Sequence, residues 1–458
     1  MSVEVTDIVV IGMGPGGEDA AGKLAEAGLH VTGVEARLVG GECPYWGCVP
    51  SKMMIRAAGL LAEARRIPGM AGASAVDPDW APVARRIRAE ATDWWDDKVA
   101  VDRFRELGGH FVRGRGRITG RGEVTVHTAE GARLFRARRG IVIATGTEPA
   151  VPPVPGLAGT PFWTNREAVE TEDVPQSLIV LGGGAVGAEL AQVFARFGAR
   201  VAVVEALPRL LPADEPEAGE LLTAVFAQEH IGVRTGAQVE RAGHDGRFTV
   251  ALADGEVLAA QRLLVATGRR ADLSALGVGA YGLDETARAI GTDDRMRAAD
   301  GLWAIGDVTG EGPFTHVAMY QAGIAVRDIL GQDGPPASYR AVPRVTFTDP
   351  EIGSVGLTEA RARGQGLAVR TGITQVPSSA RGWIHKAGND GFIKLIEDAR
   401  RGVLVGATSA GPAGGEVLGA LAVAVHGQVP VAGLRAMIYA YPTFHRAIED
   451  ALRDLAGR

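Results

Sequence analysis

Short apolar runs alternate with longer mixed segments along this chain, and the alternation predicts strands that alternate with helices. The first run, residues 8–11, ends at Gly12; residues 18–28 are predicted to form a helix, and residues 31–35 form a second run. The same order returns within residues 178–205. Strand, helix and strand in this order predict two β-α-β units.

Each predicted unit carries three glycines where its first strand meets its helix. The first glycine of such a set permits a tight turn, the second lets a pyrophosphate approach the backbone, and the third lets the helix pack closely. The phosphates then lie at a helix N-terminus, which favours negative charge. Two dinucleotide sites are therefore predicted. Their glycines are Gly12, Gly14 and Gly17 in the first unit and Gly182, Gly184 and Gly187 in the second.

An acidic residue ends the second strand of each unit. Glu35 follows Gly12 by 23 residues, and Glu205 follows Gly182 by the same interval. A carboxylate at this position accepts hydrogen bonds from a ribose. Repetition of the whole arrangement at one spacing indicates two nucleotide folds in a single chain.

A second repeat lies downstream of each unit. Residues 141–146 match residues 263–268, since both copies consist of an apolar strand followed by Ala-Thr-Gly. Thr145 and Gly146 end the first copy, and Gly268 ends the second. We expect each copy to close its own nucleotide fold.

Composition narrows the class of protein without identifying it. The 458 residues allow about three domains, and 22% charged with 46% apolar residues is ordinary for a globular protein. The net charge of −6 predicts no nucleic-acid partner, and the basic cluster within residues 133–139 is predicted to be a solvated edge. Residues 1–7 lack the basic start of a signal peptide, and the apolar run 417–425 is shorter than the ~20 residues that span a bilayer. We expect a cytoplasmic protein without a membrane partner.

The two cysteines of the chain, Cys43 and Cys48, lie five residues apart. In a regular helix such a pair points to different faces, so a disulfide between them needs a distorted backbone, which Pro44 and Gly47 can supply. So small a loop would add little stability, and no secretory context would keep it oxidised. We interpret the pair as a redox-cycling dithiol; the alternative is two unrelated buried thiols.

Residues 40–52, Gly-Gly-Glu-Cys-Pro-Tyr-Trp-Gly-Cys-Val-Pro-Ser-Lys, resemble the active-site segment of the pyridine nucleotide-disulfide oxidoreductases, the family of dihydrolipoyl dehydrogenase, glutathione reductase and mercuric reductase. Family members usually carry Leu-Asn-Val or Val-Asn-Val between the cysteines, whereas this chain has Pro-Tyr-Trp. Residues 342–356 also resemble the family, so the likeness covers essentially the whole chain.

The resemblance implies an α/β fold with two Rossmann-like dinucleotide-binding domains and a C-terminal α+β dimerisation domain. We expect a discontinuous FAD-binding domain at residues 1–150 and 269–335, an NAD-binding domain at 151–268, and a dimerisation domain at 336–458. The dimerisation domain implies a homodimer.

The resemblance also assigns FAD to the first glycine site and the nicotinamide dinucleotide to the second. Gly306-Asp307 is similar to the segment whose aspartate binds the flavin ribityl chain, and Gly114 to a glycine beside the FAD adenosine. Residues 314–318, ending at Ala318, begin a helix whose N-terminus would face the flavin and stabilise the reduced, anionic ring.

The residue at position 205 bears on the choice of nicotinamide cofactor. A carboxylate there binds the two ribose hydroxyls of NAD and repels the 2′-phosphate of NADP, which an arginine would accept. Glu205 therefore favours NAD, while Arg209, four residues on, leaves NADP open.

By resemblance, Cys48 is the thiol against the flavin and Cys43 the outer thiol that exchanges with substrate, for which it must ionise. Lys52 lies one helical turn beyond Cys48, from where its ammonium would reach the flavin edge. Glu189 corresponds to a family position that pairs with this lysine and contacts the nicotinamide. These four residues form the predicted catalytic set, and no metal site is predicted.

The resemblance breaks near the C-terminus. Disulfide reductases of the family carry His-Pro-Thr-x-x-Glu there, with the histidine as acid and base for the outer thiol, but this chain has Tyr441 and Arg446 in the two places. A phenol of pKa about 10 is a poorer base at neutral pH than an imidazole of about 6.5. His445 would face the same cavity if a helix began near Thr443; otherwise it is an interface histidine. Mercuric reductases also lack the histidine but add a C-terminal cysteine pair, which this chain does not have.

The sequence therefore predicts a homodimeric, FAD-dependent NAD(P)H oxidoreductase of the dihydrolipoyl dehydrogenase type that passes electrons through Cys43 and Cys48 to a small-molecule or disulfide acceptor. The alternatives are a true dihydrolipoyl dehydrogenase of a 2-oxo acid dehydrogenase complex, a quinone or metal-ion reductase, and a flavin-binding interaction subunit without turnover.

Overall fold

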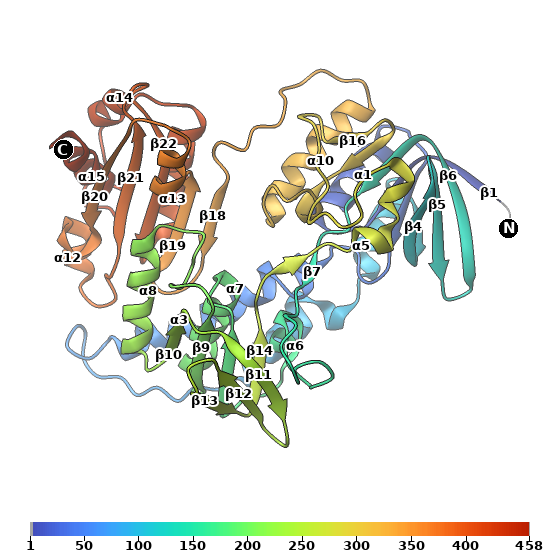
Figure 1. Ribbon diagram of the computed structural model, residues 1–458. Coiled ribbons are helices and arrows are strands. Elements are labelled where there is room, and N and C mark those ends of the chain that lie inside the picture. Colours follow the sequence, from blue (N-terminus) through green and yellow to red (C-terminus); the bar gives the residue numbers. More distant parts are fainter. Residues whose placement is uncertain (1–2, 458) are drawn as a thin grey trace. The chain divides into compact units, whose positions relative to one another are not determined.

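The chain forms two compact units, each assembled from three separate stretches of chain. A computed structural model describes residues 3–457 (Figure 1). Unit 1 contains residues 1–50, 85–150 and 269–338, and unit 2 contains residues 51–84, 151–268 and 339–458. The boundary after Pro50 falls inside helix α3 (Cys48–Arg65).

Among the described residues of unit 1, eight strands form one sheet with a parallel core. β1 pairs in parallel with β2 and with β6, and β6 pairs in parallel with β17. The path runs β16 (Arg297–Ala299), β17 (Leu302–Ala304), β6 (Gly131–Ile143), β1 (Val3–Ile11), β2 (Val31–Glu35), β3 (His110–Arg113), and the antiparallel strands β4 (Arg115–Gly120) and β5 (Glu123–Thr128) extend β6.

Helices cover this sheet, and two of them, α1 (Pro15–Glu26) and α10 (Thr315–Ile329), lie side by side (Figure 1). Ile8, Val9 and Val10 on β1 are fully buried, as expected for a parallel strand covered on both faces. The remaining elements of unit 1 are α2 (Glu42–Tyr45), η1 (Ile87–Ala91), η2 (Asp93–Trp95), α5 (Lys98–Glu106), β7 (Glu148–Pro149), β15 (Arg269–Arg270), α9 (Leu273–Leu276), η3 (Val278–Tyr281) and η4 (Gly306–Thr309). Helix α4 (Ala81–Arg86) runs across the boundary at residue 85.

The first helix begins earlier than the predicted 18–28. It starts at Pro15, directly after Gly14 at its N-cap, and ends at Glu26. The first helical position favours proline, because the fixed φ of proline suits the helix and an N–H at this position would have no partner within the helix. Gly28, with φ +86°, lies beyond the end.

Unit 2 contains a parallel sheet and, in its described part, two antiparallel ones. The parallel sheet repeats the strand-helix-strand order, since β8 leads through α7 (Ala185–Arg196) to β9. Its strands run β10 (Gly232–Thr235), β9 (Arg200–Glu205), β8 (Ser177–Leu181), β14 (Arg262–Val265), flanked by α6 (Asn165–Glu170), α8 (Pro216–Gln228) and the antiparallel strands β11 (Val239–His244), β12 (Phe248–Leu252) and β13 (Val257–Ala260).

The C-terminal part of unit 2 is an antiparallel sheet with helices on it. The strand path is β18 (Pro343–Thr346), β19 (Glu351–Gly356), β22 (Val403–Gly411), β21 (Phe392–Asp398), β20 (Val369–Gln375). Its helices are α11 (Glu359–Gly364), η5 (Val376–Ser378), α12 (Ala380–His385), α13 (Gly414–His426), α14 (Val431–Ala436) and α15 (Ala447–Gly457). The apolar run 417–425 lies in α13, where it covers β19 and β22. Within residues 3–457 we find no helix with the length and apolarity that crossing a membrane demands.

Candidate active site

The first glycine turn connects β1 to α1 and holds the predicted ribose carboxylate in place. Gly12 has φ +92°, and a Cβ there would come within 2.5 Å of the carbonyl oxygen of Ala144. A Cβ on Gly17 would overlap the carbonyl oxygen of Gly12. Glu35 accepts hydrogen bonds from the backbone N–H of Met13 at 2.8 Å and of Arg37 at 2.7 Å. The tight turn and close packing thus account for two of the three predicted glycines.

The second turn reproduces this geometry between β8 and α7. Gly182 has φ +105°, and a Cβ on Gly182 or Gly187 would overlap a backbone carbonyl oxygen. Glu205 is 8% exposed and accepts hydrogen bonds from the N–H of Gly183 at 2.6 Å and of Leu207 at 2.7 Å. The repeat seen in the sequence is therefore also a repeat in three dimensions.

The middle glycine of each turn tests whether the site fits a dinucleotide. Gly14 has φ −68° and Gly184 φ −74°, which any residue can adopt. A Cβ on either would meet no protein atom within 4 Å. Nothing in the chain itself requires glycine at these two helix N-termini, whereas a pyrophosphate lying against the backbone does. The residues present therefore fit the two dinucleotides.

Strand ends close each turn as expected from the Ala-Thr-Gly repeat. Thr145 lies against Gly12, because a Cβ on Gly12 would be 2.8 Å from the Thr145 Cα. Gly146 and Gly268 follow the ends of β6 and β14, with φ +62° and φ +114°.

Three distant segments of unit 1 converge beside α1. A Cβ on Gly16 would lie 3.1 Å from the Cβ of Ala318 on α10, and a Cβ on Gly306 would lie 3.4 Å from the same atom. Ala318 therefore packs where α1, α10 and the Gly306 turn meet. Gly114 has a structural reason of its own, since a Cβ there would come within 2.6 Å of the carbonyl oxygen of His127.

Asp307 is held by residues that the sequence analysis missed. Its carboxylate accepts a hydrogen bond from Thr147 Oγ1 at 2.8 Å and lies 3.9 Å from Arg269 Nε. Arg269 also donates to the Thr147 side chain at 2.9 Å and lies 3.8 Å from Glu42, the residue before Cys43. The signal was available, because Arg269 directly follows the second Ala-Thr-Gly.

The dithiol segment begins directly against the first glycine turn. The Gly40 N–H donates to the carbonyl of Met13 at 2.7 Å, and a Cβ on Gly41 would be 2.9 Å from the Gly14 Cα. Gly40 and Gly41 have φ +104° and +65°. Two successive glycines are needed here, because the chain makes a left-handed turn in contact with another backbone segment.

The two sulfurs lie within reach of each other and are present as thiols. Cys43 lies in the short helix α2, and Cys48 is the first residue of α3. The Cys43 thiol donates a hydrogen bond to Cys48, and this bond, together with burial, raises the pKa of Cys43 well above its usual range. Cys48 Sγ also lies 3.5 Å from the hydroxyl of Thr315, the first residue of α10. Cys43 is thus the thiol that keeps its proton.

Tyr45 and Trp46, the unusual residues between the cysteines, form part of the packing. Tyr45 is 6% exposed, and its hydroxyl donates to the carbonyl of Asp96 at 3.4 Å. Burial, with the nearby carboxylate of Asp97, raises the pKa of Tyr45 to about 12. The Trp46 ring lies 5.8 Å from the Tyr45 ring.

Lys52 and Glu189 form an ion pair in unit 2. Lys52 Nζ lies 2.8 Å from Glu189 Oε2, and the Glu189 side chain is 6% exposed. Sequence reasoning missed a third partner, Phe347. Its N–H donates to Glu189 Oε1 at 2.8 Å, and its ring centroid lies 4.6 Å from Lys52 Nζ. The carboxylate is thereby held at both oxygens.

Tyr441 and His445 do not form a buried acid–base pair in the structure of this chain. Tyr441 is 70% exposed, with the Arg446 guanidinium 5.2 Å from its ring centroid, and Arg446 pairs with Glu449 at 3.1 Å. Helix α15 begins at Ala447 rather than near Thr443, so the condition under which His445 would face the cavity is not met, and the alternative of an interface histidine stays a prediction. The His445 ring lies 6.2 Å from the ring of Tyr439. The first N–H groups of α15 bond three residues back, from Ala447 to Phe444 at 3.1 Å and from Ile448 to His445 at 3.0 Å, so the residues before Ala447 form a turn rather than a turn of α-helix.

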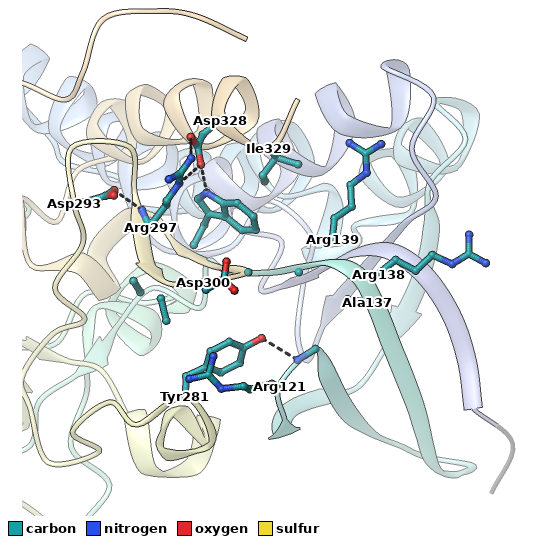
Figure 2. A pocket seen from close by; sticks show the side chains of 16 residues that line it. Arg121, Ala137, Arg138, Arg139, Tyr281, Asp293, Arg297, Asp300, Asp328 and Ile329 are labelled. Carbon is teal, nitrogen blue, oxygen red and sulfur yellow. Dashed lines mark hydrogen bonds and ion pairs between the residues drawn. The ribbon is translucent and has the colours of Figure 1, made fainter. Parts of the chain in front are cut away.

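Unit 1 also has a broad depression of about 1010 Å³. Figure 2 shows the side chains that line it. It borders Gly140 within β6 and Gly301 directly before β17, at the end of these strands where their parallel pairing begins. Asp328 lies at its side and accepts hydrogen bonds from Arg297 Nε at 2.6 Å and from the Trp303 indole N–H at 2.8 Å. Dinucleotides bind at the carboxyl ends of parallel strands, so this depression at the opposite ends is a separate feature.

A fold that repeats one dinucleotide-binding turn and sets a thiol pair against the first copy is that of a dithiol oxidoreductase with two dinucleotide cofactors. Comparison with known proteins agrees. The pyridine nucleotide-disulphide oxidoreductase profile matches residues 6–322, and the dimerisation-domain profile of the same family matches residues 342–452.

Individual relatives align over nearly the full chain. Dihydrolipoyl dehydrogenase of Chlorobaculum tepidum is 34% identical over 458 residues, 98% of this chain and 96% of the relative. Mercuric reductase of Shigella flexneri is 34% identical over 461 residues, 97% of this chain and 80% of the relative. The Cu(II) complex of the HOCl-induced flavoprotein disulfide reductase RclA from Escherichia coli superposes with a TM-score of 0.86 at 26% identity, over 98% of this chain and 99% of that one.

The chain therefore belongs to the pyridine nucleotide-disulfide oxidoreductase family. Members of this family are FAD-dependent oxidoreductases that use NAD(P)H. The predicted α/β fold and the presence of a C-terminal dimerisation domain are confirmed.

Proposed function

We propose that this protein takes electrons from NADH, passes them through FAD to Cys43 and Cys48, and delivers them to an acceptor that does not need an imidazole base. The contact between the two thiols and Thr315 is the observation that carries this proposal. It supports Cys48 as the thiol that ionises first, because Cys43 donates to it and retains its own proton.

The surroundings of Glu205 support NADH rather than NADPH as the donor. Glu205 is buried and fixed by two backbone N–H groups, so a 2′-phosphate would have to approach an anion in a poorly solvated site. Arg209, the cation that could have offset this charge, instead donates to the carbonyls of Pro212 at 3.1 Å and Asp214 at 3.2 Å.

FAD, when bound, supplies the chemistry that exchanges a hydride with the nicotinamide and electrons with the dithiol. Gly12, Gly14 and Gly17 would hold its pyrophosphate, Glu35 a ribose, and Asp307 the ribityl chain. Among the protein groups, Cys48 would act as the inner thiolate and Cys43 as the outer thiol. Lys52, oriented by Glu189, would supply positive charge beside the reduced ring.

The C-terminal turn supports an acceptor other than a thiol substrate. Exchange between thiols requires a proton to move to and from the outer thiol, and in place of the family's imidazole this chain has Tyr441, with the Arg446 guanidinium over its ring. A quinone or a metal ion can accept electrons without that transfer. Relatives named mercuric reductase, and a structural neighbour solved with Cu(II), support the metal-ion option.

A true dihydrolipoyl dehydrogenase is the second candidate, favoured by the relatives that carry this name. It would require a base to reach Cys43 from a second copy of the chain. An interaction subunit without turnover is a third reading, and the intact dithiol and the Lys52–Glu189 pair speak against it.

We further propose a homodimer in the cytoplasm. The dimerisation domain and three of its strongly exposed large side chains support self-association: Trp383 at 72%, Ile438 at 96% and Tyr441 at 70%. Dependence on NADH and on a cycling dithiol supports a reducing compartment.

An acceptor panel with the purified holoenzyme tests the proposal. NADH oxidation is measured with a quinone, Hg²⁺, Cu²⁺ and lipoamide at equal concentration, and the Cys43→Ser variant reveals which acceptors use the dithiol. We expect turnover with the quinone or a metal ion to exceed turnover with lipoamide. Faster turnover with lipoamide would favour the second candidate, and no NADH oxidation with any acceptor would favour the third.

A further inference from the structure

The turn that joins β18 to β19 is fixed to two helices of unit 2. Gln192 on α7 accepts from the Asp349 N–H at 2.8 Å and donates to the Asp349 carbonyl at 2.9 Å. The Asp349 carboxylate lies 2.8 Å from Arg196 on α7 and 2.7 Å from Arg66, which follows the end of α3. Arg196 is 5% exposed, so these contacts are shielded from solvent. Four polar contacts from both helices therefore fix where this turn lies.

Phe347 stands on the same turn, two residues before Asp349, and faces the Lys52–Glu189 pair. Its N–H donates to one carboxylate oxygen of Glu189 at 2.8 Å, while Lys52 takes the other oxygen at 2.8 Å. The Lys52 ammonium also lies 4.6 Å from the centre of the Phe347 ring. The backbone and the side chain of one residue thus contact both members of the pair.

The ring restricts a side chain that is otherwise poorly restrained. Lys52 keeps 35% of its side chain exposed, and besides its ion pair with Glu189 its ammonium donates to the Ser51 hydroxyl at 3.3 Å. A lysine side chain has four rotatable bonds and one ion pair does not fix it. The face of an aromatic ring attracts an ammonium group through the negative charge of its π system.

We propose that Phe347 is a positioning residue for Lys52: its ring holds the ammonium in the direction from which it acts on the flavin. This inference rests on the proposed function of Lys52. The contribution belongs to the ring alone, because the N–H that binds Glu189 is present whatever side chain occupies position 347. Substitution at this position therefore separates ammonium placement from carboxylate placement.

The first test needs no turnover. Holoenzyme samples of the native protein, Phe347→Leu and Phe347→Tyr are treated with acetic anhydride, and acetylation of Lys52 is followed by mass spectrometry. Lys23, which pairs with Asp19 at 2.7 Å in unit 1, is the internal reference. We expect Lys52 to react about fivefold faster in Phe347→Leu, as loss of a cation–π contact of ordinary strength would allow, and at the native rate in Phe347→Tyr.

The second test connects the ring to the chemistry. Phe347→Leu should slow the reduction of the flavin by NADH in a single turnover about fivefold, and Phe347→Tyr should restore it. In a Lys52→Met background the same Phe347→Leu change should have no further effect. An equal loss in that background, or Lys52 acetylation that is unchanged by Phe347→Leu, overturns the proposal. Failure of the native protein to oxidise NADH would refute the proposed function instead, and Lys52 acetylation would still decide the role of Phe347.

Discussion

The dithiol segment and the C-terminal turn differ in how completely each is built within one chain. Cys43 and Cys48 contact one another, Cys48 contacts Thr315, and the glycines that precede them lie against the first dinucleotide turn. At the C-terminal turn, Tyr441 is 70% exposed and Arg446 is stacked on it. Tyr441 therefore stands exposed in the place where disulfide reductases of the family carry their histidine.

The difference separates two kinds of chemistry that disulfide reductases of this family combine. Transfer of electrons to the dithiol would use Cys43, Cys48, Lys52 and Glu189, which the chain retains. Proton transfer at the outer thiol would use a base whose place Tyr441 takes. A protein can keep electron transfer to the dithiol without proton transfer at the outer thiol if its acceptor takes electrons without exchanging thiols. The four predictions below test each side of this comparison.

The largest effect should follow removal of the inner thiol. We expect the native protein to develop a long-wavelength absorbance band on two-electron reduction, because a Cys48 thiolate next to the oxidised flavin gives charge-transfer absorption. Cys48→Ser should abolish the band and lower dithiol-dependent turnover by at least about a thousandfold, since loss of a catalytic nucleophile removes a step that no other group supplies.

Cys43→Ser is the matched control for that experiment. It should show the band without any reductant, because Cys48 is then unable to form a disulfide and can remain a thiolate. A visible spectrum recorded before and after one equivalent of dithionite makes the comparison. If the band survives in Cys48→Ser and disappears in Cys43→Ser, the two roles are reversed.

Cofactor preference should be the next largest effect. We expect kcat/KM for NADH to exceed that for NADPH by at least about a hundredfold, ~2.7 kcal/mol of barrier, because the 2′-phosphate would face the buried Glu205 carboxylate. Steady-state rates with both cofactors measure the ratio. Glu205→Gln should reduce the preference, and Arg209→Gln should not change it, since Arg209 is engaged by Pro212 and Asp214. Equal rates in the native protein contradict this account.

Much of this architecture was predictable because it depends on local backbone requirements. Gly12 and Gly182 occupy turns with positive φ, and Glu35 and Glu205 stand at the ends of strands. The equal interval between glycine and glutamate in the two copies made these positions recognisable in the sequence. Helix α1 begins at Pro15, three residues before the predicted start, because Gly14 at the N-cap and Pro15 at the first position favour a helix start there.

Contacts between residues distant in sequence were not predictable from the same patterns. Thr315 and Phe347 reach Cys48 and Lys52 from segments about 267 and 295 residues away, and neither stands in a spacing that indicates a partner. His445 would have faced the cavity only if a helix began near Thr443, and α15 begins at Ala447. The alternative, an interface histidine, stays a prediction.

The altered C-terminal turn predicts a smaller but measurable deficit with thiol substrates. Lipoamide should be a poorer acceptor than a quinone in the native protein, because Tyr441 stands in the place of the histidine that moves the proton of the outer thiol. Tyr441→His combined with Arg446→Glu should raise lipoamide turnover at least about tenfold, ~1.4 kcal/mol of barrier, and leave quinone turnover unchanged. NADH-dependent rates with the two acceptors, in both proteins, measure the change.

His445→Ala provides the control for that variant. It should have little effect on either acceptor, because His445 lies against Tyr439 before the helix begins. Efficient lipoamide turnover in the native protein that disappears in His445→Ala would show that this imidazole has taken over as the base, and that the chain is a working disulfide reductase.

The smallest expected effect concerns the proton on the outer thiol and links the two regions. The hydrogen bond to Cys48, with burial, raises the pKa of Cys43, so the thiol stays protonated at pH values where an ordinary cysteine, of pKa about 8.5, has begun to ionise. Folding stability from this group is therefore present below about pH 8.5 and falls as the pH rises further, because the unfolded chain then binds fewer protons than the folded one.

Iodoacetamide should alkylate Cys43 in the reduced native protein slowly at pH 8, at a rate that keeps rising beyond pH 9. In Cys48→Ser the main cause of the shift is gone, so alkylation at pH 8 should be about threefold to fivefold faster and should level off at a lower pH. Identical profiles in the two proteins would mean that Cys43 ionises unaided, and the missing base at Tyr441 would then no longer explain slow exchange with thiol substrates.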